Sequence, residues 1–261
     1  MQVSAFRYSG NKGRMVRVLP PPPPGTKRLV EPFLGSGAYS LSWMSQDQNL
    51  TALGIDADPR VILLWKFLQS TTPEFLQELH DWWEEKKKES PVPRVEDVRA
   101  IFGEGASLYF KINVCGVYTG QWSASQGYPQ FSLPTPKTLD ALALVNRMEV
   151  MGGDWRGAKD LLRPGDAVLL DPPYLGTRGN YLQETSFDPA GIAEEVSSWR
   201  VPVLITYGTG APEIFPGLPW ELVQIRKVPN IRRGGTVSRE EWISRINWPL
   251  EQDTIGLFSS I

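Results

Sequence analysis

The chain has 261 residues, of which 41% are hydrophobic and 21% charged, and its formal net charge is −2. This composition is that of a globular protein with one core and a modest insertion. Its single cysteine, Cys115, and single histidine, His80, exclude a disulfide framework, a cysteine-based metal site and serine–histidine or cysteine–histidine catalysis. We therefore expect chemistry based on carboxylates, backbone groups, aromatic side chains or a cofactor, without a metal.

Positive charge is concentrated in two segments. The first 28 residues contain six Lys and Arg residues and no acid, and five more cations lie between Arg226 and Arg239 before the next acid, Glu240. Only one face of a nucleic-acid enzyme has to meet phosphate, so the balanced total charge does not exclude such a substrate. The N-terminal residues lack the pattern of a signal peptide and no apolar run reaches the length of a membrane span, so we expect a cytoplasmic protein.

Apolar runs that alternate with helical patterns predict an α/β fold with a mostly parallel, doubly wound sheet. In residues 27–41 the apolar run ends in a glycine turn and leads into a helix, and in residues 51–69 it ends in an acid and leads into a helix. In residues 166–176 it ends in a proline-locked turn. Three further short runs cover residues 201–208, 220–228 and 240–247. Ligands of such sheets bind outside the carboxyl ends of the strands.

Residues 70–149 interrupt this alternation. A charged amphipathic helix is predicted over residues 75–90, and a polar-aromatic stretch rich in Gly, Ser and Gln covers residues 113–136. We therefore expect residues 70–149 to form a mostly helical inserted subdomain with loops that reach outward. Residues 1–69 and 150–261 would then form the catalytic domain.

The strongest motif is the tetrapeptide from Asp171 to Tyr174, at the end of a predicted buried strand. The exocyclic amine of a nucleic-acid base is a poor nucleophile because its lone pair is delocalised into the ring. The Asp171 carboxylate and the Pro172 carbonyl, held by Pro172 and Pro173, can accept hydrogen bonds from both amine hydrogens and so favour attack. Tyr174 offers a flat face for an extruded base. The simpler interpretation is a strand-ending acid before a proline turn.

Two further patterns indicate a nucleotide-containing cofactor. Residues 31–37, Glu-Pro-Phe-Leu-Gly-Ser-Gly, follow a predicted strand, and Gly35 and Gly37 would let the backbone approach a ligand closely. The segment lacks the Lys-Ser/Thr pair of a phosphate-binding loop, which argues against a nucleoside triphosphate. Asp56 ends the next predicted strand, where a carboxylate can accept hydrogen bonds from ribose hydroxyls. The order of the three motifs is more specific than any one of them.

In this order, the motifs resemble those of the Dam-type DNA adenine-N6 methyltransferases of the alpha class. Residues 8–12, Tyr-Ser-Gly-Asn-Lys, resemble that family's N-terminal cofactor motif, and residues 234–241 are similar to its C-terminal pattern. The resemblance implies a Rossmann-like methyltransferase sheet, S-adenosylmethionine as cofactor, double-stranded DNA as partner, and catalysis by the tetrapeptide from Asp171 to Tyr174. The cofactor contacts that it implies are Tyr8, Lys12, Glu31, Phe33, Gly35, Gly37, Asp56 and Asp171.

The resemblance also implies that the inserted subdomain, residues 70–149, recognises the DNA target, but the hairpin expected there departs from the family. The family's hairpin is rich in Asn and Arg, whereas here residues 113–122 contain no arginine, so we expect a target other than GATC. Trp122 could stack on a base or fill a small core. The pair Arg232 and Arg233 precedes two glycines that would bring backbone near a duplex, which suggests phosphate contacts. The DNA-binding residues that we predict are Tyr118, Gln121, Trp122, Gln126, Arg232 and Arg233.

Two alternatives compete with methylation of adenine. The first is methylation of another planar amine, cytosine N4 or the side-chain amide of a protein glutamine. Those families more usually carry Ser or Asn at the first position of the tetrapeptide, so Asp171 argues against them. The second is a non-catalytic DNA-binding module that senses the cofactor. The simultaneous presence of Lys12, Asp171 and Tyr174 argues against it, since such a module would not require the whole set.

Overall fold

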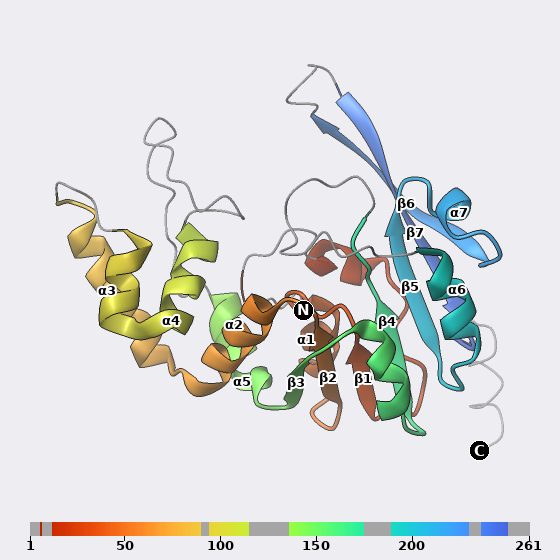
Figure 1. Cartoon of the computed structure of the whole chain (residues 1–261), viewed down its shortest axis with the longest axis horizontal. Coiled ribbons are helices and arrows are strands. Elements are labelled where there is room, and N and C mark those ends of the chain that lie inside the picture. The colour runs from red at the N-terminus through yellow and green to blue at the C-terminus, as the bar shows by residue number, and fades with distance from the viewer. Residues whose placement is uncertain are drawn as a thin grey trace.

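A computed structural model of the chain describes residue 6 and residues 12–89, 94–114, 136–174, 189–229 and 236–249. Strands and helices alternate through most of these ranges (Figure 1). The elements are η1 Lys12–Arg17, β1 Arg28–Glu31, α1 Ala38–Met44, β2 Thr51–Asp56, α2 Pro59–Ser70, α3 Pro73–Lys86, α4 Val95–Val114, α5 Pro136–Val145, β3 Met148–Gly152, η3 Trp155–Leu161, β4 Asp166–Leu170, α6 Pro189–Ser197, β5 Val203–Gly208, α7 Ala211–Ile214, β6 Trp220–Pro229 and β7 Thr236–Ile246.

The seven strands form one sheet in the order β3-β2-β1-β4-β5-β7-β6. The pairs from β3 to β5 are all parallel, whereas β7 is antiparallel to both β5 and β6. The first five positions repeat the order of the Rossmann fold, and the strand order reverses between β1 and β4. The α/β class and the mostly parallel, Rossmann-like sheet expected from the sequence are confirmed, with a reversed hairpin added at one edge.

Helices cover both faces of the sheet, because successive residues of its central strands point to opposite sides. Leu29 and Leu169 belong to a core cluster with α1, α2 and α5, whereas their neighbours Val30 and Leu170 belong to a second cluster with η3, α6 and α7. All five residues of β4 are buried. Strands buried on both faces read as continuous apolar runs, which is why the sequence revealed them so clearly.

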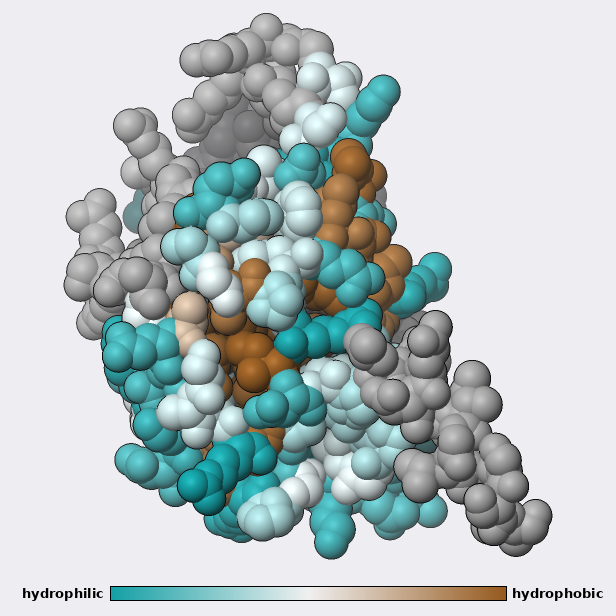
Figure 2. Space-filling view, turned by 90° about the vertical axis from the view of Figure 1, so that its right-hand side faces the viewer, coloured by the Kyte–Doolittle hydropathy of each residue, from teal (hydrophilic) through white to brown (hydrophobic). Residues whose placement is uncertain are grey.

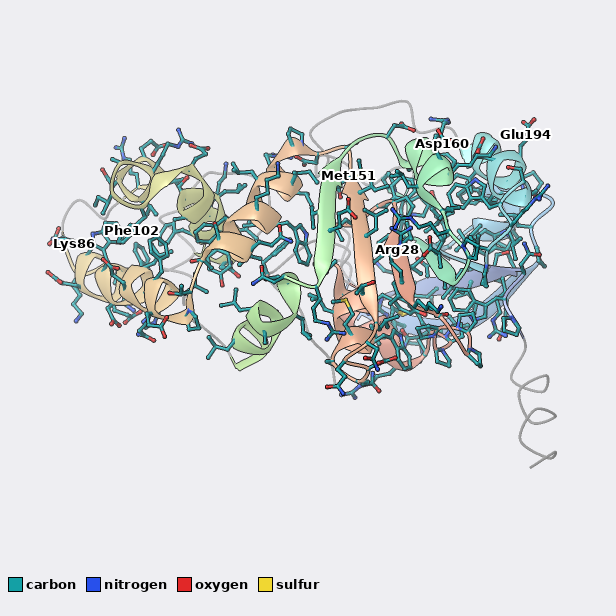
Figure 3. The ribbon with its side chains drawn as sticks, turned by 90° about the horizontal axis from the view of Figure 1, so that it is seen from below. Arg28, Lys86, Phe102, Met151, Asp160 and Glu194 are labelled. Carbon is teal, nitrogen blue, oxygen red and sulfur yellow. The ribbon has the colours of Figure 1, made fainter. Side chains whose placement is uncertain are left out.

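Helices α3 and α4 extend away from the sheet, with Lys86 and Phe102 far from Glu194 of α6 (Figure 3). Their buried side chains nevertheless belong to the same hydrophobic cluster as those of α1, α2 and α5. Trp83 of α3 and Phe110 of α4 meet edge to face, with ring centroids 4.9 Å apart. The helical content expected between residues 70 and 149 is present in the described part of that range, and β3 spans the boundary expected after residue 149.

The two central strands are joined at their amino-terminal ends by a partly buried ion pair. Arg28 and Asp166 are register partners on β1 and β4. The guanidinium donates to both carboxylate oxygens, at 3.0 and 2.7 Å, and also to the carbonyl of Leu161 at 2.7 Å. A two-point contact of this kind fixes geometry as well as adding attraction. It holds β1 beside β4, at the end of the strands opposite to the expected ligand site.

Strand β6 forms an exposed edge of the sheet. Ile225 on this strand is 58% exposed and Leu222 is 40% exposed. Figure 2 looks onto this side of the molecule and shows hydrophobic patches among hydrophilic residues. A register irregularity between Leu222 and Gln224 interrupts the strand, and such bulges discourage pairing with another chain. Within the described ranges, no helix combines the length and the apolar character needed to cross a membrane.

Candidate functional site

Three of the motifs found in the sequence meet at the carboxyl-terminal ends of the central strands of the sheet. Strand β1 lies between β2 and β4 and is parallel to both, so the segments that follow these strands emerge side by side. They are the glycine loop after Glu31, the Asp56 carboxylate at the end of β2 and the turn that begins at Asp171. The strand order reverses between β1 and β4, and a doubly wound sheet binds its ligand at such a reversal, outside the carboxyl-terminal ends of the strands.

The glycine loop is fixed by hydrogen bonds to its neighbours. The backbone N–H of Leu34 donates to the carbonyl of Ile55 at 2.9 Å, and the N–H of Gly35 donates to Oδ2 of Asp56 at 2.9 Å. On the other side of the loop, the indole N–H of Trp65 on α2 donates to the carbonyl of Gly35 at 2.9 Å. Hydrogen bonds to β2 and to α2 therefore fix the shape of the loop.

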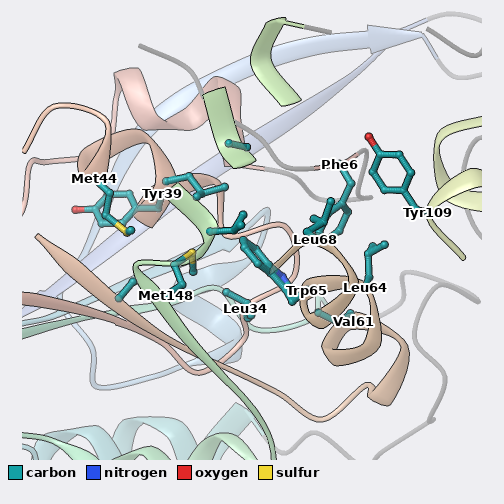
Figure 4. Close-up of a cluster of buried hydrophobic side chains, with 14 of the residues drawn as sticks. Phe6, Leu34, Tyr39, Met44, Val61, Leu64, Trp65, Leu68, Tyr109 and Met148 are labelled. Atoms are coloured by element: carbon teal, nitrogen blue, oxygen red, sulfur yellow. The ribbon is translucent and has the colours of Figure 1, made fainter. Parts of the chain in front are cut away.

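Both predicted loop glycines adopt backbone angles that favour glycine. Gly35 has φ +47° and Gly37 has φ +57°, in the left-handed region. A Cβ atom at Gly37 would also lie 2.8 Å from the ring of Trp65, which packs beneath the loop beside Leu34 (Figure 4). The glycine pattern in the sequence thus reflects both a turn and a close approach to a buried aromatic ring.

Asp56 uses both carboxylate oxygens to organise backbone. Oδ2 accepts from Gly35, and Oδ1 accepts from the N–H of Asp58 at 2.9 Å. Burial raises the pKa of Asp56 to about 6, while the two backbone hydrogen bonds act in the opposite direction. A carboxylate has about four acceptor positions. Asp56 therefore has acceptor positions left while it holds the loop, and its predicted contact with ribose hydroxyls stays a prediction.

Glu31 lies beneath the loop. It is 4% exposed, and its Oε1 accepts from the backbone N–H of Ser40 in α1 at 2.8 Å. Burial and, to a smaller extent, the nearby charge of Asp171 raise the pKa of Glu31 to about 7, while hydrogen bonding with Ser40 acts in the opposite direction. The contact with Ser40 shows how Glu31 supports the start of α1. Its predicted contact with a cofactor stays a prediction.

A fourth segment, which was not predicted to belong to the site, lies beside these three at the carboxyl-terminal end of β3. After β3, the N–H of Gly153 donates to the carbonyl of Asp56 at 3.1 Å, and Trp155 follows at the start of η3. The ring of Trp155 stacks on that of Phe33, with centroids 5.9 Å apart. Phe33, a predicted cofactor contact, is therefore part of an aromatic pair. The Gly-Gly-Asp sequence before Trp155 was the available signal.

The Asp171 side chain is held by the neighbouring strand. Leu170 and Ile205 are register partners on β4 and β5, so the next residues, Asp171 and Thr206, lie side by side. The hydroxyl of Thr206 donates to Oδ1 of Asp171 at 2.8 Å, and Thr206 itself is buried. No motif in the sequence marked Thr206.

The ring of Tyr174 rests on β5. Its centroid lies 4.7 Å from that of Tyr207, at an interplanar angle of 47°, and a Cβ atom on Gly208 would lie 2.8 Å from the Tyr174 ring. The Tyr174 hydroxyl donates to Oε2 of Glu241 on β7 at 3.1 Å. One ring of the predicted tetrapeptide is therefore oriented by three residues that were not among the predicted site residues.

Several predicted residues lie outside the described ranges: Tyr8, Tyr118, Gln121, Trp122, Gln126, Arg232 and Arg233. Lys12 begins η1. Pro172 and Pro173 lie between Asp171 and Tyr174, and their predicted part in catalysis stays a prediction. In the described part of the chain, no group of three or more His, Cys, Asp or Glu residues is arranged to hold a metal ion.

No protein-family model and no curated protein matches the chain. Among solved structures, it is similar to precorrin-6y C5,15-methyltransferase from Geobacter metallireducens, with 8% identity and a TM-score of 0.41 over 90% of this chain and 85% of that chain. TrmN from Thermus thermophilus is similar at 14% identity and a TM-score of 0.35, over 85% of this chain and 45% of that chain. Likeness at this level carries no information on activity.

Proposed function

We propose that this protein is an S-adenosylmethionine-dependent methyltransferase that methylates the N6 amine of adenine in double-stranded DNA. The observation that carries the proposal is the position of the turn from Asp171 to Tyr174. It lies at the reversal of strand order, beside the glycine loop and Asp56, with its carboxylate and its ring both oriented by β5. An acceptor for an amine and a flat surface for a base thus adjoin a site suited to a nucleotide cofactor.

The residues at the loop suit such a cofactor. Asp56 retains acceptor positions for two ribose hydroxyls, and the loop at Gly35 and Gly37 has the compact backbone that lets a ligand approach closely. The resemblance adds Tyr8, Lys12, Glu31, Phe33 and Asp171 as contacts. When bound, the cofactor supplies an activated methyl group on its sulfonium.

Asp171 and the Pro172 carbonyl act on the acceptor. Each accepts a hydrogen bond from one amine hydrogen, which turns the nitrogen lone pair toward the methyl carbon. The amine nitrogen oriented in this way would take the methyl group that a bound cofactor supplies, and its surplus proton would pass to water. The step needs no covalent enzyme intermediate, so catalysis depends on alignment, which is worth up to about 7–11 kcal/mol.

Tyr174 supplies the surface on which the base rests. An adenine inside a duplex cannot reach a site at the edge of a sheet, so it must be rotated out of the helix, which costs a few kcal/mol. Stacking on an aromatic ring returns about 1–3 kcal/mol. The basic segments around Arg232 and Arg233 and in the first 28 residues are proposed to contact the phosphate backbone.

The experiment is to express the protein in a strain that lacks adenine methylation and to map modified bases by single-molecule sequencing. Methylated adenine in a defined sequence context supports the proposal, and the Asp171→Ala variant should show none. Purified protein with labelled cofactor should also be offered duplex DNA, RNA and total protein. Label on cytosine or on a protein glutamine would establish the alternative acceptors, and binding of cofactor and DNA without transfer would establish a sensing module.

A further inference from the structure

The hydroxyl of Tyr174 is tied to the antiparallel hairpin at the edge of the sheet. It donates to Oε2 of Glu241 at 3.1 Å, and Oε1 of Glu241 accepts from Nη2 of Arg226 at 2.7 Å. These three residues come from the turn after β4, from β7 and from β6. The loop that carries the predicted base-stacking ring is thereby connected to two strands that lie beyond β5.

Strand register explains why these groups meet. Gly208 of β5 and Glu241 of β7 are direct antiparallel partners, so their side-chain positions lie on the same face of the sheet. Gly208 has no side chain, and the ring of Tyr174 occupies the space that a Cβ atom would take. From that position the hydroxyl of Tyr174 reaches the carboxylate of Glu241. A larger residue at Gly208 would separate the two.

The environment of Glu241 makes the contact specific. Its side chain is only 8% exposed, whereas that of Arg226 is 36% exposed. A buried carboxylate is costly unless it is paired and hydrogen-bonded. Arg226 supplies the opposite charge and Tyr174 a hydroxyl donor. The ring is thus held on one side by Tyr207 and at its tip by Glu241.

We propose that Glu241, held by Arg226, is a positioning residue that fixes the tilt of the Tyr174 ring for the incoming base. This role rests on the proposed function, because it presupposes that a base stacks on Tyr174. The same role accounts for the last residue of the C-terminal Arg-Glu-Glu sequence, residues 239–241. The alternative is that Glu241 and Arg226 merely join β6 to β7, independently of the ring.

The test is single-turnover methylation of a duplex that carries the mapped target site. Tyr174→Phe removes only the hydroxyl and leaves the Arg226–Glu241 pair intact. We expect its rate constant to fall about tenfold, the loss expected when a hydrogen bond to a charged group aligns the base. The dissociation constants for cofactor and DNA should change less than about twofold. Glu241→Ala should show a similar loss, and Glu241→Gln, which retains an acceptor, a smaller one.

A double-mutant cycle separates positioning from support of the hairpin. If Glu241 acts through the hydroxyl, Glu241→Ala should cause little further loss of rate in the Tyr174→Phe background. The matched control is Glu221→Ala, which breaks another β6–β7 ion pair, with Arg245 at 3.3 Å. It should leave the rate unchanged. Melting temperatures identify variants that are destabilised.

Two results overturn the role of Glu241: an unchanged rate in Tyr174→Phe, or fully additive losses in the double variant. Either result would come from a wild-type enzyme that methylates adenine, so the proposed function would stand. Absence of DNA methylation by the wild-type protein would instead defeat the proposed function and the role of Glu241 with it.

Discussion

Thr206, buried in β5, donates its hydroxyl to Oδ1 of Asp171 at 2.8 Å, and so ties the predicted catalytic carboxylate to the adjacent strand. We expect Thr206→Val, which keeps the shape but removes the donor, to lower kcat for methylation by about tenfold, because Asp171 loses a charge-assisted hydrogen bond. Thr206→Ser should retain most of the activity.

The measurement is steady-state kinetics together with cofactor titration. A loss confined to kcat would agree with misalignment of Asp171. A rise in KM with unchanged kcat would contradict it, because that pattern marks binding that is equal in ground and transition states. Equal activity of Thr206→Val and the wild type would show that Asp171 is oriented without this hydroxyl.

Much of the fold could be predicted because its signals are local. Strands β1, β2 and β4 are apolar runs followed directly by a glycine turn, an acid or a proline turn, and topology then brings Gly35, Asp56 and Asp171 to one edge. The relation of Thr206 to Asp171 spans 35 residues, and that of Glu241 to Tyr174 spans 67. Both depend on which strands pair and in which register, and neither has a local signature.

The roles of buried carboxylates were equally hard to foresee. Glu31 and Asp56 look alike in the sequence, as acids at the ends of apolar runs. In the structure, Glu31 accepts a hydrogen bond from the N–H of Ser40 in α1. Asp56 instead accepts from the N–H groups of Gly35 in the loop and of Asp58 at the start of α2. Backbone hydrogen bonds of this kind depend on the path of the chain, which residue type alone does not specify.

Glu31 should make stability depend on pH. Its pKa is raised from 4.5 to about 7 by burial, so the folded state binds a proton more tightly than the unfolded state. The associated stabilisation is fully present below about pH 4.5 and is lost as the pH rises through 7. At about 1.4 kcal/mol per pH unit, it amounts to about 3 kcal/mol.

Glu31→Gln keeps an oxygen acceptor for Ser40 and cannot ionise. We therefore expect its free energy of unfolding to change less between pH 5 and pH 8 than that of the wild type, by about 2–3 kcal/mol. Urea unfolding at the two pH values gives the comparison. Parallel pH profiles for the two proteins would show that Glu31 does not change its protonation in this range.

Asp56 should control affinity for S-adenosylmethionine. Two charge-assisted hydrogen bonds to ribose are each worth about 1.5–3 kcal/mol, so Asp56→Ala should raise the Kd at least about tenfold. Because the pKa of Asp56 is about 6, the carboxylate is charged above that pH and neutral below it. Affinity should therefore weaken as the pH falls below 6, and Asp56→Asn should remove this dependence. Calorimetry across pH 5–8 provides the test, and unchanged affinity in both variants would move the cofactor site elsewhere.

DNA recognition should divide between two groups of residues. Gln can pair bidentately with adenine, whereas guanine is usually read by Arg or Lys, and residues 118–126 contain Gln121 and Gln126 but no cation. We therefore expect Gln121→Ala to relax or shift the methylated sequence, at a cost of about 1–3 kcal/mol in discrimination. Arg233→Ala should instead weaken binding to all sequences about equally and reduce the salt dependence, since a phosphate contact carries no sequence information.

Base-resolution maps and salt titrations of both variants measure these effects. An unchanged target in an active Gln121→Ala enzyme would exclude Gln121 from base reading, and plain GATC methylation by the wild type would refute the expected change of target.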